Sequence, residues 1–140
     1  MDDCMKSNRA ITYVEGLDEL IEDGIPVSSS VLVTGGPGTG KTTLAAQFIY
    51  NGAKHGERGA LILIGQTRER FKADMALMGF EFDAMDKKGA VRIYELPIYD
   101  RKFDANFSNL VLELTSFGPK RIAMDSFSIF FSSVEGKDNE

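Results

Sequence analysis

Residues 30–42 read Ser30-Val31-Leu32-Val33-Thr34-Gly35-Gly36-Pro37-Gly38-Thr39-Gly40-Lys41-Thr42. The first five residues form a short β-branched run, which predicts a buried strand. A glycine-rich loop follows at once, and apolar residues then recur at helical spacing from Lys41 to about Lys54. The loop contains the pattern Gly-x-x-x-x-Gly-Lys-Thr, and its place between a strand and a helix is the context that this pattern requires.

The chemistry of the loop predicts a phosphate-binding site. Glycines at 35, 38 and 40 let the backbone turn tightly and point successive N–H groups inward. Those donors, with the positive end of the following helix, form a cradle for an anion. We expect Lys41 to reach the outer phosphates as a point charge and the Thr42 hydroxyl to coordinate magnesium.

The alternative is a glycine-rich turn that only connects the strand to the helix. From average composition, the pattern arises by chance in roughly one chain of this length in a few hundred, and correct placement makes chance rarer still. We therefore predict that the loop binds the triphosphate of a nucleotide. The predicted nucleotide-binding residues are Gly35, Gly36, Pro37, Gly38, Thr39, Gly40, Lys41, Thr42 and Thr43.

The rest of the chain alternates strands with helices. Further strands are expected at 60–64, from 91 to about 96 and at 121–125, and the run 60–64 is apolar throughout, as in a sheet covered on both faces. Helices are expected at 16–21 and at 107–117, and a loop at 97–104. A further helix is expected after Thr67, which caps it, with Phe71, Met75 and Met78 on one packed face. This order predicts an α/β fold with a mostly parallel sheet and helices on both faces.

Composition limits the classes of function. The chain has 140 residues, a net charge of −5, and basic residues only in scattered pairs, so charge does not support nucleic-acid binding. No apolar run approaches the ~20 residues that cross a membrane. A single cysteine, Cys4, excludes an internal disulfide and fits a reducing compartment. We expect a cytoplasmic protein with no membrane association.

Asp125 is the second candidate metal ligand. It ends the apolar strand at 121–125, and in phosphate-loop proteins an acidic residue at that place holds the magnesium ion, often through water. An aspartate at a strand end is by itself commonly a turn former or a helix cap. Taken with the loop, we predict that Thr42 and Asp125 both serve magnesium.

Several blocks of the sequence together resemble the KaiC family of RecA-like P-loop ATPases, over about residues 11–133. The blocks are Gly16-Leu17-Asp18-Glu19-Leu20-Ile21, Gly24-Ile25-Pro26, the glycine-rich loop, Gln47-Phe48-Ile49-Tyr50-Asn51-Gly52-Ala53, Gly79-Phe80, Gly89-Ala90-Val91-Arg92-Ile93 and Met124-Asp125-Ser126. The resemblance implies a RecA-like core, ATP and Mg²⁺ as cofactors, phosphate contacts from residues 38–43, and self-association in a ring with nucleotide between subunits. The choice of adenine rests on the resemblance, because phosphate loops read phosphates and not bases.

The sequence departs from the family after the second strand. Members usually carry a pair of glutamates there, one of which activates the attacking water, whereas this chain reads Ile64-Gly65-Gln66-Thr67-Arg68-Glu69. Gly65 has no side chain, and Gln66 can orient a water but cannot accept its proton. Glu69 falls a turn later, where the helix dipole explains a carboxylate. Gln66 and Glu69 are therefore weak catalytic candidates, and fast hydrolysis is not expected.

The second departure concerns the strands that follow the acidic strand in a RecA-like core. We expect residues 126–140 to supply none of them. We divide the chain into an N-terminal arm (1–10), a partial ATP-binding domain (11–135) and a polar tail (136–140). Three interpretations are open: a fragment of a longer protein, a decayed gene product, or a chain completed by a partner.

Three functions follow from these residues. The first is binding of magnesium ATP with weak or absent hydrolysis. The second is a regulatory or assembly module in which nucleotide acts as a switch without catalysis. The third, a recombinase-like ATPase stimulated by DNA, is disfavoured by the acidic charge balance.

Overall fold

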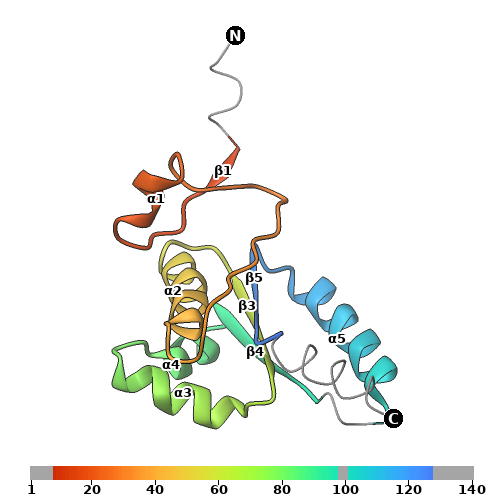
Figure 1. Ribbon diagram of the computed structural model, residues 1–140. Coiled ribbons are helices and arrows are strands. Elements are labelled where there is room, and N and C mark those ends of the chain that lie inside the picture. Colours follow the sequence, from red (N-terminus) through yellow and green to blue (C-terminus); the bar gives the residue numbers. More distant parts are fainter. Residues whose placement is uncertain (1–7, 98–100, 128–140) are drawn as a thin grey trace, which may run out of the picture.

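A three-stranded parallel sheet forms the centre of the molecule in the computed structural model, which describes residues 8–97 and 101–127 (Figure 1). The strands are β3 (Gly59–Ile64), β4 (Val91–Leu96) and β5 (Arg121–Asp125), in the spatial order β4-β3-β5. Leu61 of β3 stands opposite Ile93 of β4 and Ala123 of β5. All three strands were predicted, and the α/β fold class is confirmed.

Helices cover both faces of this sheet. The helices α2 (Lys41–Lys54), α3 (Arg68–Leu77) and α4 (Phe82–Lys87) pack on one face, and α5 (Phe103–Phe117) packs on the other (Figure 1). Successive β3 side chains point to opposite faces, so Leu61 joins the core under α2 while Ile62 joins the core under α5. Every residue of β3 is buried, which confirms the strand expected from its unbroken apolar run.

A small N-terminal unit precedes the glycine-rich loop. The strands β1 (Arg9–Ala10) and β2 (Ile25–Pro26) pair antiparallel, and α1 (Leu17–Leu20) lies between them in the chain. The Arg9 side chain donates a hydrogen bond of 2.8 Å to the Gly24 carbonyl. Thus part of the segment expected to be an arm is paired. The helix α1 lies within the predicted range 16–21, and its Leu20 side chain is 83% exposed.

The segment 30–34 is not a strand, contrary to the sequence prediction. It runs without regular secondary structure toward the glycine-rich loop, and Val31 and Leu32 are 61% and 73% exposed. A strand needs a neighbour to pair its backbone N–H and C=O groups. Among the described residues, β5 lies at one edge of the sheet and nothing pairs along its outer side. The β-branched residues of this segment therefore form no strand, because no described strand is present to pair with them.

The remaining differences lie at the ends of helices. α3 ends at Leu77, and Met78, which the periodicity placed on the packed face, is 57% exposed. α5 begins at Phe103, one turn before the predicted Phe107. The short α4 was not predicted, because six residues give too little periodicity to detect. No helix in the described ranges is both long enough and apolar enough to cross a bilayer.

Candidate phosphate-binding site

The glycine-rich loop leads directly into the N-terminus of α2. Gly38 and Gly40 have φ angles of 73° and 92°, in the left-handed region that favours glycine. Gly40 is the N-cap of α2 and no side chain caps this end, so the first N–H groups of the helix lack intrahelical acceptors. Thr39 steadies the turn, because its hydroxyl donates to the Gly36 carbonyl at 2.8 Å. The loop therefore offers free donors and a positive helix end at one place.

Lys41 holds its charge over the loop. Its Nζ donates hydrogen bonds to the carbonyls of Gly35 and Gly36, at 2.8 and 2.7 Å. The ammonium group is thus anchored by two loop carbonyls instead of extending into solvent. This position places a positive charge beside the backbone cradle that the sequence predicts for phosphates.

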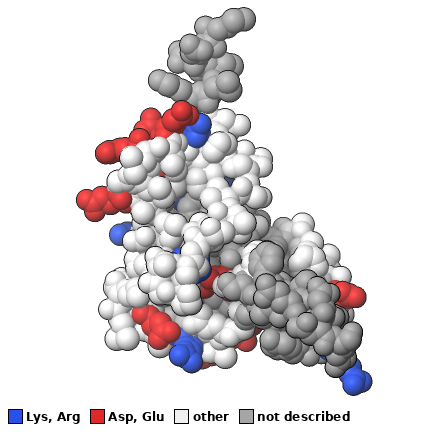
Figure 2. All heavy atoms as spheres, in the orientation of Figure 1, with Lys and Arg blue, Asp and Glu red and all other residues white. Residues whose placement is uncertain are grey.

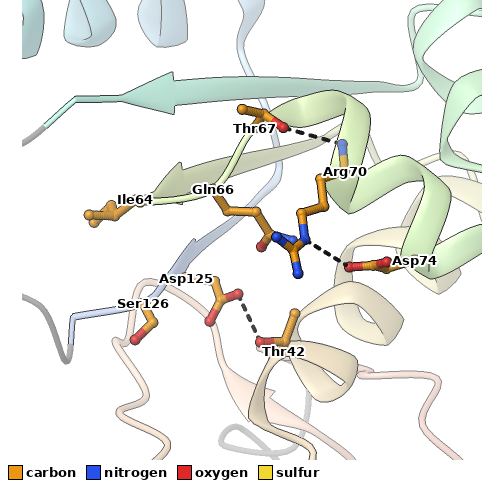
Figure 3. A pocket seen from close by; sticks show the side chains of 9 residues that line it. Thr42, Ile64, Gln66, Thr67, Arg70, Asp74, Asp125 and Ser126 are labelled. Atoms are coloured by element: carbon orange, nitrogen blue, oxygen red, sulfur yellow. Dashed lines mark hydrogen bonds and ion pairs between the residues drawn. The ribbon is translucent and has the colours of Figure 1, made fainter.

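Thr42 and Asp125 meet although 83 residues separate them in the chain: the Thr42 hydroxyl donates a hydrogen bond of 2.9 Å to Asp125 Oδ2. α2 packs across β5, so the first turn of the helix lies beside the carboxyl end of the strand (Figure 3). The sequence predicted that these two residues share a site, and the structure brings them together.

A cavity of about 470 Å³ opens beside this pair (Figure 3). Its walls come from the first turn of α2, the carboxyl ends of β3 and β5, and the first two turns of α3. The lining residues are Thr42, Ile64, Gly65, Gln66, Thr67, Arg70, Asp74, Asp125 and Ser126. Thr42, Gln66 and Asp125 were singled out from the sequence, whereas Arg70 and Asp74 were not. Their spacing of four residues on a helix was the only available signal, and it does not indicate which way the helix faces.

The residues after β3 differ in how they meet this cavity. Gly65 has a φ of 78°, which any other residue would adopt only with strain. Gln66 is half-buried and its side chain points into the cavity (Figure 3). Glu69 is exposed on α3 and is absent from the cavity wall. Of the two weak catalytic candidates, only Gln66 lies at the site.

A second cavity, of about 300 Å³, lies along the loop itself. It is lined by the predicted residues Gly38, Thr39, Gly40, Lys41, Thr42 and Thr43, together with Met78. The Thr43 hydroxyl lies 3.8 Å from the Met78 sulfur. Gly35, Gly36 and Pro37 do not line it. Met78 adds an apolar wall that the sequence analysis assigned to the core.

The oxygen atoms at the site suit a magnesium ion. The Thr42 hydroxyl and the Asp125 carboxylate are hard donors, and Mg²⁺ is commonly held by one or two carboxylates together with phosphates and water. In the described part of the chain, no three His, Cys, Asp or Glu side chains gather as a metal site of their own. The Thr42 hydroxyl and the Asp125 carboxylate are the oxygens in place to hold such an ion at this cavity.

The charged residues do not form a basic surface on the visible face. In Figure 2 the Lys and Arg side chains lie at separate places, with acidic side chains between them. This distribution agrees with the scattered basic pairs of the sequence and gives no support to a nucleic-acid site on that face.

A family model and individual relatives all relate this chain to KaiC-like proteins. The family model described as "ATPase: KaiC" matches residues 10–138. The chain is 38% identical over 87 residues to the UPF0273 protein of Thermotoga maritima, covering 62% of this chain and 36% of that protein. It is 31% identical over 126 residues to the circadian clock oscillator protein KaiC of a Picosynechococcus species, covering 90% of this chain and 24% of that protein.

A solved structure extends the likeness to three dimensions. The crystal structure of a KaiC-like protein from Pyrococcus horikoshii superposes with a TM-score of 0.78 at 36% identity, and the match covers 86% of this chain and 54% of that one. The chain therefore spans about a quarter to a half of the length of these relatives.

Proposed function

The chain belongs to the KaiC family of ATPases, and on that premise we propose that it binds ATP with magnesium and hydrolyses it slowly or not at all. Family membership supports nucleotide binding at a coarse level. The observation that carries the finer proposal is the 2.9 Å hydrogen bond between Thr42 and Asp125 beside the glycine-rich loop. It joins the two predicted magnesium ligands at the place where the loop and the helix N-terminus meet.

Each part of the site has a distinct role in this proposal. The loop backbone and the N-terminus of α2 hold the phosphates through N–H groups. Lys41 neutralises the outer phosphates. Thr42 and Asp125 hold the magnesium ion, which when bound would neutralise phosphate charge. Met78 offers an apolar surface next to Thr43, where the flat face of a base could pack.

Slow hydrolysis follows from the groups that line the cavity of about 470 Å³. Gln66 can orient a water through its amide but cannot take up a proton at neutral pH. Asp125 is engaged with Thr42. A general base contributes roughly 10²–10⁴ in rate to reactions of this kind. The site therefore retains the groups that bind, while the position after β3 carries an amide in place of a base for the attacking water.

A titration of the protein with fluorescent ATP tests the proposal. We expect saturable binding that weakens when magnesium is chelated and is lost in Lys41→Ala. Lys54→Ala is the matched control, because Lys54 lies at the other end of the same helix and its Nζ sits 5.9 Å from the Tyr50 ring centroid. Absence of binding at millimolar ATP by folded wild-type protein would refute the proposal.

The second candidate function is a module that self-associates in response to nucleotide, as the family resemblance implies. Two observations favour it: the missing base, and the exposed apolar side chains of Val31 and Leu32 just before the loop. Size-exclusion chromatography with and without magnesium ATP distinguishes it from simple binding. An oligomeric state that ignores nucleotide would count against it.

A further inference from the structure

The Arg70 side chain enters the same cavity as Thr42 and Asp125. Nine residues line this cavity, and Arg70 is the one basic residue among them, on a wall that also carries the carboxylates of Asp74 and Asp125. In Figure 3 the side chains of Arg70 and Gln66 both point into the space in front of the Thr42–Asp125 pair. An arginine there places a planar, multiply donating cation beside the predicted magnesium site.

The ion pair of Arg70 with Asp74 does not account for this position. Arg70 Nε lies 4.0 Å from Asp74 Oδ2, and the two side chains are 79% and 52% exposed. Exposed pairs one helical turn apart contribute little to stability and do not hold a guanidinium in one place. Arg70 can therefore exchange this partner for a stronger anion without loss to the fold.

The neighbouring Arg68 shows the contrast. Its Nε lies 3.7 Å from Glu95 of β4, and its backbone N–H donates to the same carboxylate at 2.6 Å. Arg68 is absent from the cavity wall. Two arginines in the first turn of α3 thus differ, one joined to the sheet and the other directed to the site.

Thr42 connects the two cavities, since it lines both. Lys41 lines the cavity along the loop, and Arg70 lines the cavity on the other side of Thr42. A chain of phosphates that runs from the loop past Thr42 would have Lys41 on its loop side and Arg70 at its far end. The two cations therefore approach one ligand from different sides.

From this arrangement we propose that Arg70 binds the terminal phosphate of a nucleoside triphosphate, so that the site distinguishes triphosphate from diphosphate. The proposal rests on the nucleotide binding proposed above. Arginine and phosphate form charge-assisted, often bidentate hydrogen bonds, and a diphosphate lacks the group that would reach this side chain. Arg70 acts here as a binding residue of the same subunit.

The test compares the affinities of the full chain for ATP and ADP, both with magnesium, in Arg70→Ala, Arg70→Lys and the control Arg68→Ala. We expect Arg70→Ala to lose about tenfold in ATP affinity, the usual effect of one charged hydrogen bond, while ADP affinity stays within about twofold. Arg70→Lys should recover part of the loss, because a point charge replaces only some of the fork. Arg68→Ala should bind both nucleotides as the wild type does.

The outcomes separate this proposal from the one on which it rests. If the wild type binds ATP but Arg70→Ala keeps the same ratio of ATP to ADP affinity, the role of Arg70 is refuted and nucleotide binding stands. If the folded wild type binds neither nucleotide, both proposals fail. Because the Arg70 side chain is 79% exposed, we expect its variants to fold, and circular dichroism checks this.

Discussion

The guanidinium of Arg121 lies against the Cα of Gly52 so closely that a side-chain carbon at position 52 would overlap it. Arg121 is only 2% exposed. Its Nε donates a hydrogen bond of 2.5 Å to Glu57, and its other two nitrogens donate to the carbonyls of Ile11 and Phe48. One buried side chain thus ties the start of β5 to α2 and to the segment before α1, and it holds the helix that carries the phosphate loop.

Gly52→Ala should therefore destabilise the protein. Alanine normally strengthens a helix by up to about 1 kcal/mol relative to glycine, but overlap with a packed side chain costs about 1–3 kcal/mol, so we expect a net loss in the free energy of unfolding by urea. The sign should reverse in an Arg121→Ala background, because the overlapping group is gone. An equal loss in both backgrounds would contradict this close contact.

Asp125→Asn should remove most of the magnesium dependence of ATP binding. Asparagine keeps an oxygen that can accept the Thr42 hydrogen bond, so the fold is retained while the charge on the metal ligand is lost. We expect the affinity for magnesium ATP to fall about tenfold or more, toward the value measured in EDTA. Asp74 lines the same cavity, so Asp74→Asn is the control, and its affinity for magnesium ATP should not fall in this way. A magnesium effect that persists in Asp125→Asn would assign the metal to other groups.

Gln66→Glu should raise the rate of ATP hydrolysis. The side chain points into the cavity beside Thr42 and Asp125, and a carboxylate there can accept the proton that an amide cannot. We expect a gain of about a hundredfold, the lower end for a general base, in single-turnover measurements with labelled ATP. Position 66 is the suitable choice, because Gly65 has a φ of 78° that a glutamate would adopt only with strain. An unchanged rate would show that Gln66 is not placed to act on water.

Acid should weaken the ion pairs of Asp83, with Lys87 inside α4 and with Lys72 of α3. Hydrogen bonds from Lys87 first, and then from Lys72, hold the pKa of Asp83 below its ordinary value of 3.8. The folded protein then binds fewer protons here than the unfolded chain, so the stability that Asp83 contributes is complete above pH ~4 and is lost as pH falls through the folded pKa. The free energy of unfolding, measured with urea, should fall less steeply below pH ~4 in Asp83→Asn than in the wild type. If the free energy of unfolding changes with pH equally in both proteins, Asp83 does not contribute this acid-sensitive stability.

The chain itself determined most of the local structure and the chemistry of the loop. Periodicity and turn chemistry act between neighbours in sequence, so α2, the Thr67 cap of α3 and the buried strand β3 follow from adjacent residues. The meeting of Thr42 with Asp125 was also predictable, because in phosphate-loop proteins the loop threonine and an acidic residue at a strand end serve the same magnesium ion.

Only the tertiary structure decided which segments find partners and which side chains share a cavity. Within the part of the chain that the structure describes, the β-branched run at 30–34 pairs with no strand, since a strand forms only where another strand accepts its backbone bonds. Arg70 and Arg68 have the same local signal, but the packing of α3 on the sheet turns Arg70 to the cavity beside Thr42 and Arg68 to Glu95. Arg121 reads as a surface residue in sequence and is buried because carbonyls and a carboxylate from distant segments converge on it. Such convergence depends on packing between segments far apart in the chain, which a local sequence pattern cannot predict.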